Sequence, residues 1–147
     1  MRLSYTLKQS DPVDLVTPLV GHLQEMYDPQ TAQAFRAPLT QINELRNKVI
    51  HLNRNANTSD PEIDRMAELL SAYTRYALVL LNRFNWNSDR GKVVTGLTLT
   101  WYDSFQQKLE FKKSLIAFDV FCCYYNLAIL QLTKCLRCNV ETEAGRK

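Results

Sequence analysis

The longest apolar stretch of the chain, residues 114–135, constrains the fold more than any other part of the sequence. Its apolar side chains recur at steps of three and four residues, which places them on one face of an α-helix. They are Leu115, Phe118, Phe121, Cys122, Tyr125, Ala128, Ile129 and Leu132, widened by Ile116, Val120, Leu127 and Leu130. So little of the circumference is polar that we expect this helix to be buried on nearly all sides, covered by the rest of the chain.

A β-strand is predicted just before this helix, at residues 97–102. Leu97, Leu99 and Trp101 alternate with threonine and tyrosine, and such alternation is typical of a half-buried strand because side chains change face at every residue. The same pattern occurs at residues 3–7. Because an isolated strand leaves backbone groups unsatisfied, we expect these two strands to pair. A short lysine-rich connection then leads to the long helix.

Two helices are predicted after the first strand. Thr17 caps the first of them, because Pro18 fits the first turn of a helix but would disrupt a later turn. Asp28 with Pro29 ends this helix, and the second helix is bent near Pro38. Their apolar faces are Leu19, Val20, Leu23, Met26 and Tyr27 in the first, and Phe35, Leu39, Ile42, Leu45, Val49 and Leu52 in the second.

A third helix begins at a capping box. The Ser59 hydroxyl can accept a hydrogen bond from the backbone of Glu62, while the Glu62 carboxylate reaches back to the backbone of Ser59. The helix continues with a strictly spaced stripe: Ile63, Met66, Leu70, Tyr73, Ala77, Leu80 and Phe84. This stripe predicts an antiparallel helix pair. The polar run at residues 53–58 is expected to be a loop, and residues 85–91 break the helical pattern.

Composition and charge favour one soluble, mainly helical domain. The chain has 147 residues, of which 46% are hydrophobic and 22% charged, with 4 Gly and 5 Pro, so it is neither disordered nor collagen-like. A net charge of +3 with scattered arginines does not provide the basic stripe that nucleic-acid binding needs. The first residues lack a signal segment, so we expect a chain that is not exported.

The sequence contains no familiar catalytic constellation. His22 and His51 fall on separate predicted helices, and neither has a serine or cysteine in a nucleophile setting. We interpret both as plain surface or edge residues. None of the glycines forms a phosphate-binding loop. The sequence therefore predicts a protein that is not an enzyme and has no catalytic residue and no cofactor.

The four cysteines are not expected to bind a metal. Cys122 and Cys123 form one pair, and Cys135 and Cys138 form a second pair that begins 13 residues after Cys122. This separation is ~20 Å along one helix. The two pairs therefore cannot share a zinc ion. The later pair ends a helix, whereas a thioredoxin-like motif begins one after a strand. We predict reduced cysteines that fill a core, and no metal site.

A membrane-spanning helix is the alternative interpretation of the long apolar run. Ser114 to Thr133 is twenty residues long and flanked by basic residues, which is the length and setting of a spanning helix. Asp119, Asn126 and Gln131 oppose it, because an aspartate near the bilayer centre costs ~3 kcal/mol. We favour a buried soluble helix and keep a small single-pass membrane protein as the alternative.

Two motifs resemble the signature of the Bro domain family, which includes Alix, the rhophilins and the fungal Bro and PalA proteins. The strand reads Leu-Thr-Trp-Tyr-Asp-Ser at residues 99–104, and the helix has Phe-Asp at 118–119 and Tyr-Asn-Leu-Ala at 125–128. The signature residues are Thr100, Trp101, Tyr102, Asp103, Phe118, Asp119 and Asn126. Weaker matches precede them at residues 5–8, 13–19 and 44–46. Asp119 is shorter than the family's glutamate, and Val120 and Thr133 replace a lysine and a glutamine.

The resemblance implies a mainly α fold, a helical array with tetratricopeptide-like packing plus a small N-terminal β-sheet. Residues 1–147 would be one domain, about the first third of a Bro-type domain. The family's domain is a non-catalytic adaptor that takes the amphipathic C-terminal helix of an ESCRT-III subunit into an apolar groove, in endosomal sorting; Rho-type signalling is the role in the rhophilin branch. That groove lies beyond Lys147, so no binding residue is carried over. A cytoplasmic, endosome-associated protein is expected.

The resemblance also implies that one face of the long helix is exposed. Each helix of such an array is buried against the next, so a chain that stops after the fourth helix would leave an apolar face of residues 114–135 exposed. We therefore expect self-association through this helix, or its coverage by a partner or a membrane surface.

Overall fold

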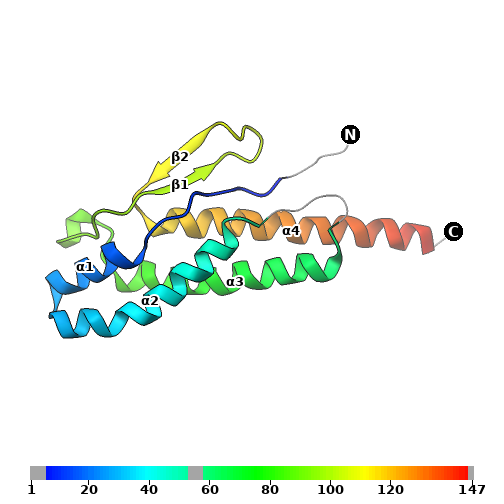
Figure 1. The fold of residues 1–147 in the computed structure, drawn as a ribbon. Helices are drawn as coiled ribbons and strands as arrows, with labels where there is room; N and C mark the ends of the chain where they lie inside the picture. Colours follow the sequence, from blue (N-terminus) through cyan, green and yellow to red (C-terminus); the bar gives the residue numbers. More distant parts are fainter. Residues whose placement is uncertain (1–5, 53–57, 146–147) are drawn as a thin grey trace.

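The computed structural model describes residues 6–52 and 58–145 (Figure 1). In chain order, its elements are α1 (Val16–Met26), α2 (Pro29–Val49), α3 (Asp60–Arg83), a 3-10 turn (Ser88–Arg90), β1 (Leu99–Tyr102), β2 (Glu110–Lys113) and α4 (Ile116–Gly145). The predicted fold class is confirmed, since the chain is mainly helical with one small sheet. The predicted loop at residues 53–58 lies almost wholly outside the described residues.

Helix α4 lies between two layers (Figure 1). On one side it packs along α3, and α2 in turn packs against α3 and α1. On the other side it carries the β1–β2 hairpin and the N-terminal segment that precedes α1. The core therefore follows the inner face of α4, where the helical layer meets the hairpin.

The capping box and stripe of α3 are confirmed. The Ser59 hydroxyl accepts from the Glu62 backbone, and the Glu62 carboxylate accepts from the Ser59 backbone. The stripe residues Ile63, Met66, Leu70, Tyr73, Ala77 and Leu80 are all buried. A reciprocal cap and a strict apolar period both depend only on neighbouring residues, so the sequence was sufficient to predict this helix.

The predicted start of α1 is wrong. Thr17 does not cap the helix; it lies in the first turn after the cap residue Leu15, and the Asp14 carboxylate accepts from the backbones of Val16 and Thr17. Hydrogen bonds from these groups, that of the Thr17 side chain first, lower the pKa of Asp14. The aspartate thus satisfies amide groups that a threonine cap would have served.

The turn between α1 and α2 also differs from the prediction. Asp28 caps α2 by accepting from the backbone of Thr31, so the Asp28–Pro29 pair that was predicted to end the first helix also begins the second. Met26, Tyr27 and Phe35, which were placed on apolar faces, are exposed. They lie where α1 and α2 meet at the edge of the bundle, and no further helix covers them. Pro38 lies inside α2, whose axis changes direction along its length (Figure 1).

The strand pairing is the main correction to the fold. β1 pairs with β2 in an antiparallel hairpin in which Leu99 lies opposite Lys113 and Tyr102 opposite Glu110, so the lysine-rich connection is itself a strand. Residues 6–8 of the predicted N-terminal strand are not extended in a sheet, and residues 3–5 lie outside the described part. The N-terminal segment does return to β1, but through an isolated bridge between Ser10 and Trp101.

α4 is partly rather than almost completely buried. The helix is longer than predicted, reaching Gly145, and its inner face is buried through Ile116, Val120, Cys122, Cys123, Ile129 and Leu130. Another face is exposed, with Phe121 at 63% and Tyr124 at 51% of their full exposure. A helix needs neighbours on all sides to be buried all round, and in the described chain α3 and the hairpin layer leave this face uncovered.

Candidate functional site

Two signature residues, Trp101 and Asp119, meet at a buried polar cluster centred on the Asp119 carboxylate, on the inner face of α4. Trp101 of β1 donates its indole N–H to Oδ1 of Asp119 at 2.7 Å, and Tyr73 of α3 donates its hydroxyl to Oδ2. Arg46 of α2 donates from Nε to Oδ2 at 2.7 Å and from Nη2 to Oδ1 at 3.0 Å. The two charged side chains are fully buried, so this is a bidentate ion pair inside the core.

Arg46 extends this junction to the N-terminal segment. It also donates from Nη2 to the Ser10 hydroxyl at 3.0 Å and from Nη1 to the Asp11 carbonyl at 3.1 Å. Ser10 in turn donates to the backbone carbonyl of Thr100 at 2.6 Å. One guanidinium and one carboxylate therefore join α2, α3, α4, β1 and the N-terminal segment.

The electrostatics of the junction favour the ionised pair. Burial by itself lowers the pKa of Arg46, but the negative charge of Asp119 and the hydrogen bond to it together outweigh burial and raise that pKa above its usual value. Burial, together with the same carboxylate, raises the pKa of Tyr73 well above its usual value. Tyr73 is therefore held as a neutral donor, and the group satisfies its polar atoms without offering a proton near neutral pH.

Asn126, seven residues after Asp119 on α4, also holds the N-terminal segment. Its side-chain carbonyl accepts from the backbone N–H of Lys8 at 2.7 Å, and its amide donates to the Lys8 carbonyl at 3.0 Å. The Lys8 ammonium lies 4.8 Å from the centroid of the Tyr125 ring. The Tyr125 hydroxyl shares a hydrogen bond with Ser104 at 2.8 Å. Asn126 thus pairs with the backbone as a neighbouring strand would.

The remaining signature residues shape the hairpin. Tyr102 donates its hydroxyl to the Asp11 carboxylate at 2.8 Å, which raises the pKa of Tyr102. The Asp103 carboxylate accepts from the backbone amides of Gln106 and Phe105, which lower its pKa and close the start of the turn. Phe118 is partly buried against the core. The structure therefore joins Trp101 directly to Asp119, while Asn126 and Tyr102 hold the N-terminal segment and Asp103 closes the turn.

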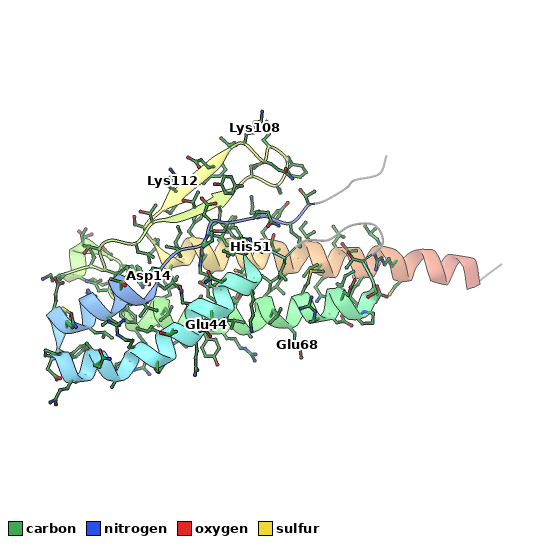
Figure 2. The ribbon with its side chains drawn as sticks, in the orientation of Figure 1. Asp14, Glu44, His51, Glu68, Lys108 and Lys112 are labelled. Carbon is green, nitrogen blue, oxygen red and sulfur yellow. The ribbon has the colours of Figure 1, made fainter. Side chains whose placement is uncertain are left out.

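The β1–β2 hairpin, which is attached to α4 through Trp101, presents apolar and basic side chains to solvent. Phe105 is 70% exposed, and Leu109 and Phe111 are also exposed. Lys108 lies at the turn end of the hairpin and Lys112 along β2, both on the side away from the helices (Figure 2). Phe111 lies opposite Trp101 and therefore on the other face of β2 from Lys112. Phe105 and Lys108 both lie in the turn, and an exposed aromatic ring near a lysine suits an acidic, partly apolar partner.

The sequence analysis missed the roles of Arg46, Tyr73 and Ser10. Arg46 and Asp119 are separated by 73 residues, so no local pattern joins them. The sequence did contain a sign of this role, because Arg46 is a charged residue on the helix face that also carries the apolar Leu39 and Val49. An arginine on a buried face is almost always paired with an acidic group. Asp119 was weighed mainly as a cost to membrane insertion, whereas it is the centre of the core.

The histidines and cysteines differ in part from their predictions. His51 is exposed as expected, but His22 is buried beside Phe84, with ring centroids 6.0 Å apart. Cys122 and Cys123 are buried as predicted, whereas the later pair at 135 and 138 is exposed. Cys135 lies on an exposed side of α4, and Cys138 follows Arg137, which pairs with the first residue of α3.

Within the described residues, the side chains do not assemble a recognisable catalytic or metal site. No group of three or more His, Cys, Asp and Glu lies close enough to hold a metal ion among residues 6–52 and 58–138, whose side chains the structure describes. A cavity of about 270 Å³ beside β1 is lined by Leu7, Gln9, Tyr102, Asp103 and Gln107. Its two titratable groups, Tyr102 and Asp103, have pKa values shifted away from neutrality in opposite directions, so neither is suited to proton transfer at neutral pH.

Comparisons with known proteins agree with the resemblance in the sequence. The chain matches the model of the BRO1-like domain over residues 2–147. It is similar to a solved complex of the Alix Bro1 domain with CHMP4C (TM-score 0.63, 21% identity), covering 87% of this chain and 35% of that one. It is also similar to a Bro1 domain studied as the structural basis for endosomal targeting (TM-score 0.63, 20% identity), covering 95% and 36%. The chain thus spans about a third of the length of these structures, which share its fold. No curated protein sequence matches.

Replacing Asp119 by asparagine should strongly destabilise the fold. The substitution keeps the shape of the side chain but leaves the Arg46 charge buried without its counter-ion, and breaking such a pair costs ~3–5 kcal/mol. Urea unfolding followed by circular dichroism measures the loss. The matched control is Asp64→Asn, which removes the exposed ion pair with Lys134 and should cost less than ~1 kcal/mol. Equal losses in the two variants would contradict the central role of Asp119.

The buried thiols should make the protein sensitive to alkaline pH. Burial raises the pKa of Cys122 to about 12 and that of Cys123 well above its usual value, while unfolded cysteine titrates near ~8.5. The contribution of these thiols to stability is therefore complete below pH ~8.5 and declines as the pH rises toward the folded pKa.

Thiol labelling at neutral pH should modify only Cys135 and Cys138 before unfolding. Rapid labelling of Cys122 in the folded protein would show that the core differs.

Proposed function

Because the chain belongs to the BRO1-like domain family, we propose that it is a non-catalytic adaptor in endosomal sorting. The observation that carries the proposal is the shared fold with the Alix Bro1 domain bound to CHMP4C. The buried junction supports it, because its polar groups are consumed in holding the hairpin and helices together rather than in exchanging protons. Residues 1–147 would form the N-terminal part of such a domain, cytoplasmic and associated with endosomes.

The partner that we propose is the amphipathic C-terminal helix of an ESCRT-III subunit. Recognition of this kind places apolar side chains, one helical turn apart, into an apolar surface. The resemblance in the sequence assigns the family's main groove to residues beyond Lys147, so we assign no residue of this chain to the contact. The rigid junction around Asp119 would hold the first helices in the arrangement on which the rest of the surface depends.

A chimera in which residues 1–147 replace the matching part of the Alix Bro1 domain should bind a peptide of the CHMP4C C-terminal helix saturably. Binding is measured by fluorescence anisotropy of the labelled peptide. The control peptide has serine in place of the apolar residues on one helix face, and its affinity should fall at least tenfold, because each buried apolar side chain contributes ~1.5–3 kcal/mol. If both peptides bind equally, or neither binds, the proposed partner is wrong.

The hairpin favours a second contact, with an acidic membrane surface. Phe105 is exposed in the turn of the hairpin, which also carries Lys108, a combination in which an aromatic ring can enter the headgroup region while the lysine meets anionic lipids. The hairpin is fixed to α4 through Trp101, so its orientation relative to the helices is set. We propose that this surface contributes to recruiting the adaptor to endosomes.

A spanning helix remains the competing interpretation of α4. Residues Ile116–Cys138 form a helix of 23 residues with a mean hydropathy of 1.4, long and apolar enough to cross a membrane, and 44% of its most apolar window is buried within the fold. To insert, this helix would have to withdraw Asp119 from Arg46 and carry the carboxylate into the bilayer. The fold therefore favours peripheral binding through the hairpin.

Vesicle flotation tests the proposed membrane contact. The chain should float with vesicles containing phosphatidylserine, less so at high salt because ionic attraction is screened, and Phe105→Ser should lower the bound fraction severalfold. The matched control is Phe35→Ser, which removes an exposed phenylalanine on α2 and should have no effect. Alkaline carbonate should release the chain. Retention after carbonate, or equal effects of the two serine variants, would contradict peripheral binding by the hairpin.

A further inference from the structure

Residues 105–115 form the longest run of exposed residues in the part of the chain that the structure describes. The run covers the turn of the hairpin, all of β2 and the bend at Ser114 that leads into α4. Within the described residues, the Ser114 hydroxyl makes no hydrogen bond. A group added to the oxygen of Ser114 would therefore meet water and would break no hydrogen bond of the fold.

The residues around Ser114 have the charge pattern that basophilic protein kinases recognise. Lys112 and Lys113 precede the serine, the apolar Leu115 follows it, and all of them are exposed. Such kinases select a serine by placing the preceding basic side chains against carboxylates of their own. β2 pairs with β1 in a sheet of two strands, so no other described strand covers the outer edge of this segment.

We propose that a basophilic kinase phosphorylates Ser114 and that the phosphate releases the hairpin from acidic membranes. The reaction is a phosphoryl transfer from ATP. The Ser114 oxygen bonds to the γ-phosphorus, the bond between this phosphorus and the β–γ bridging oxygen breaks, and ADP leaves. The hydroxyl proton passes to the catalytic aspartate of the kinase. This regulation acts on the membrane contact proposed above and rests on that proposal.

The charge of the hairpin is low enough for one phosphate to reverse its sign. Residues 103–114 contain three lysines and two carboxylates, a net charge of +1. One of the lysines, Lys112, already pairs with Glu110 at 3.2 Å. A phosphoserine adds about −1.5 to −2 charges at neutral pH, so the net charge becomes negative. Anionic lipids that attract Lys108 would then repel the hairpin, which is how phosphorylation releases basic segments from membranes.

Phosphorylation in vitro tests the modification. Incubation of the chain with the catalytic domain of protein kinase C and ATP should place a phosphate on Ser114, mapped by mass spectrometry. Removing both preceding charges, as Lys112→Gln with Lys113→Gln, should slow this reaction at least tenfold. The matched control is Arg65→Gln with Arg75→Gln, which removes two exposed charges of α3 and should leave the rate unchanged. Phosphate only on other residues, or equal rates in the two double variants, would overturn the assignment.

Vesicle flotation tests the effect of the phosphate. Ser114→phosphoserine, introduced during synthesis, should lower the fraction of chain bound to phosphatidylserine vesicles at least fivefold, and a phosphatase should restore it. The matched control is Ser71→phosphoserine on the exposed side of α3, which should bind as the parent does, and circular dichroism confirms that both forms are folded. If the parent and the Ser114 form bind equally, the regulation is wrong and the membrane contact stands. If the parent fails to bind, both proposals are wrong.

Discussion

The ion pair between Asp119 and Arg46 is the interaction on which the rest of this structure depends. Two opposite charges without exposure to water are tolerated only when their remaining polar atoms are also satisfied. Here the partners come from five separate segments, including Trp101, Tyr73 and the N-terminal residues around Ser10. A misplaced segment would leave a buried polar group unpaired, so the pair favours one arrangement of helices and hairpin over other compact ones.

In that arrangement the two faces of α4 have different roles. Its inner face holds the hairpin and the N-terminal segment through Asp119 and Asn126, which makes the hairpin a rigid extension of the bundle. Its outer face carries apolar side chains and no charge over about four turns. The chain thus combines a fixed interior with exposed apolar surfaces.

Predictions from the sequence succeeded where the relevant partners are close in the chain. The capping box at Ser59, the stripe of α3 and the extended segment ending in Trp101 all depend on neighbouring residues. β2 was missed because Glu-Phe-Lys-Lys carries too weak an alternation to stand out from a loop, and its pairing is set by the turn at Asp103. The position of His22 was predicted wrongly because its burial depends on Phe84, which follows two further helices, α2 and α3, in the chain.

The sequence by itself determined which segments are helical and which residues share a face, because helical and extended periods are written in local spacing. It also contained the Trp101 and Asp119 signature that points to the family. Only the tertiary structure decided that Asp119 is the centre of the core, that Arg46 neutralises it, and that Phe121 and Tyr124 face outward. Those outcomes depend on which elements surround a side chain, and contacts between residues 73 positions apart leave no periodic trace in the sequence.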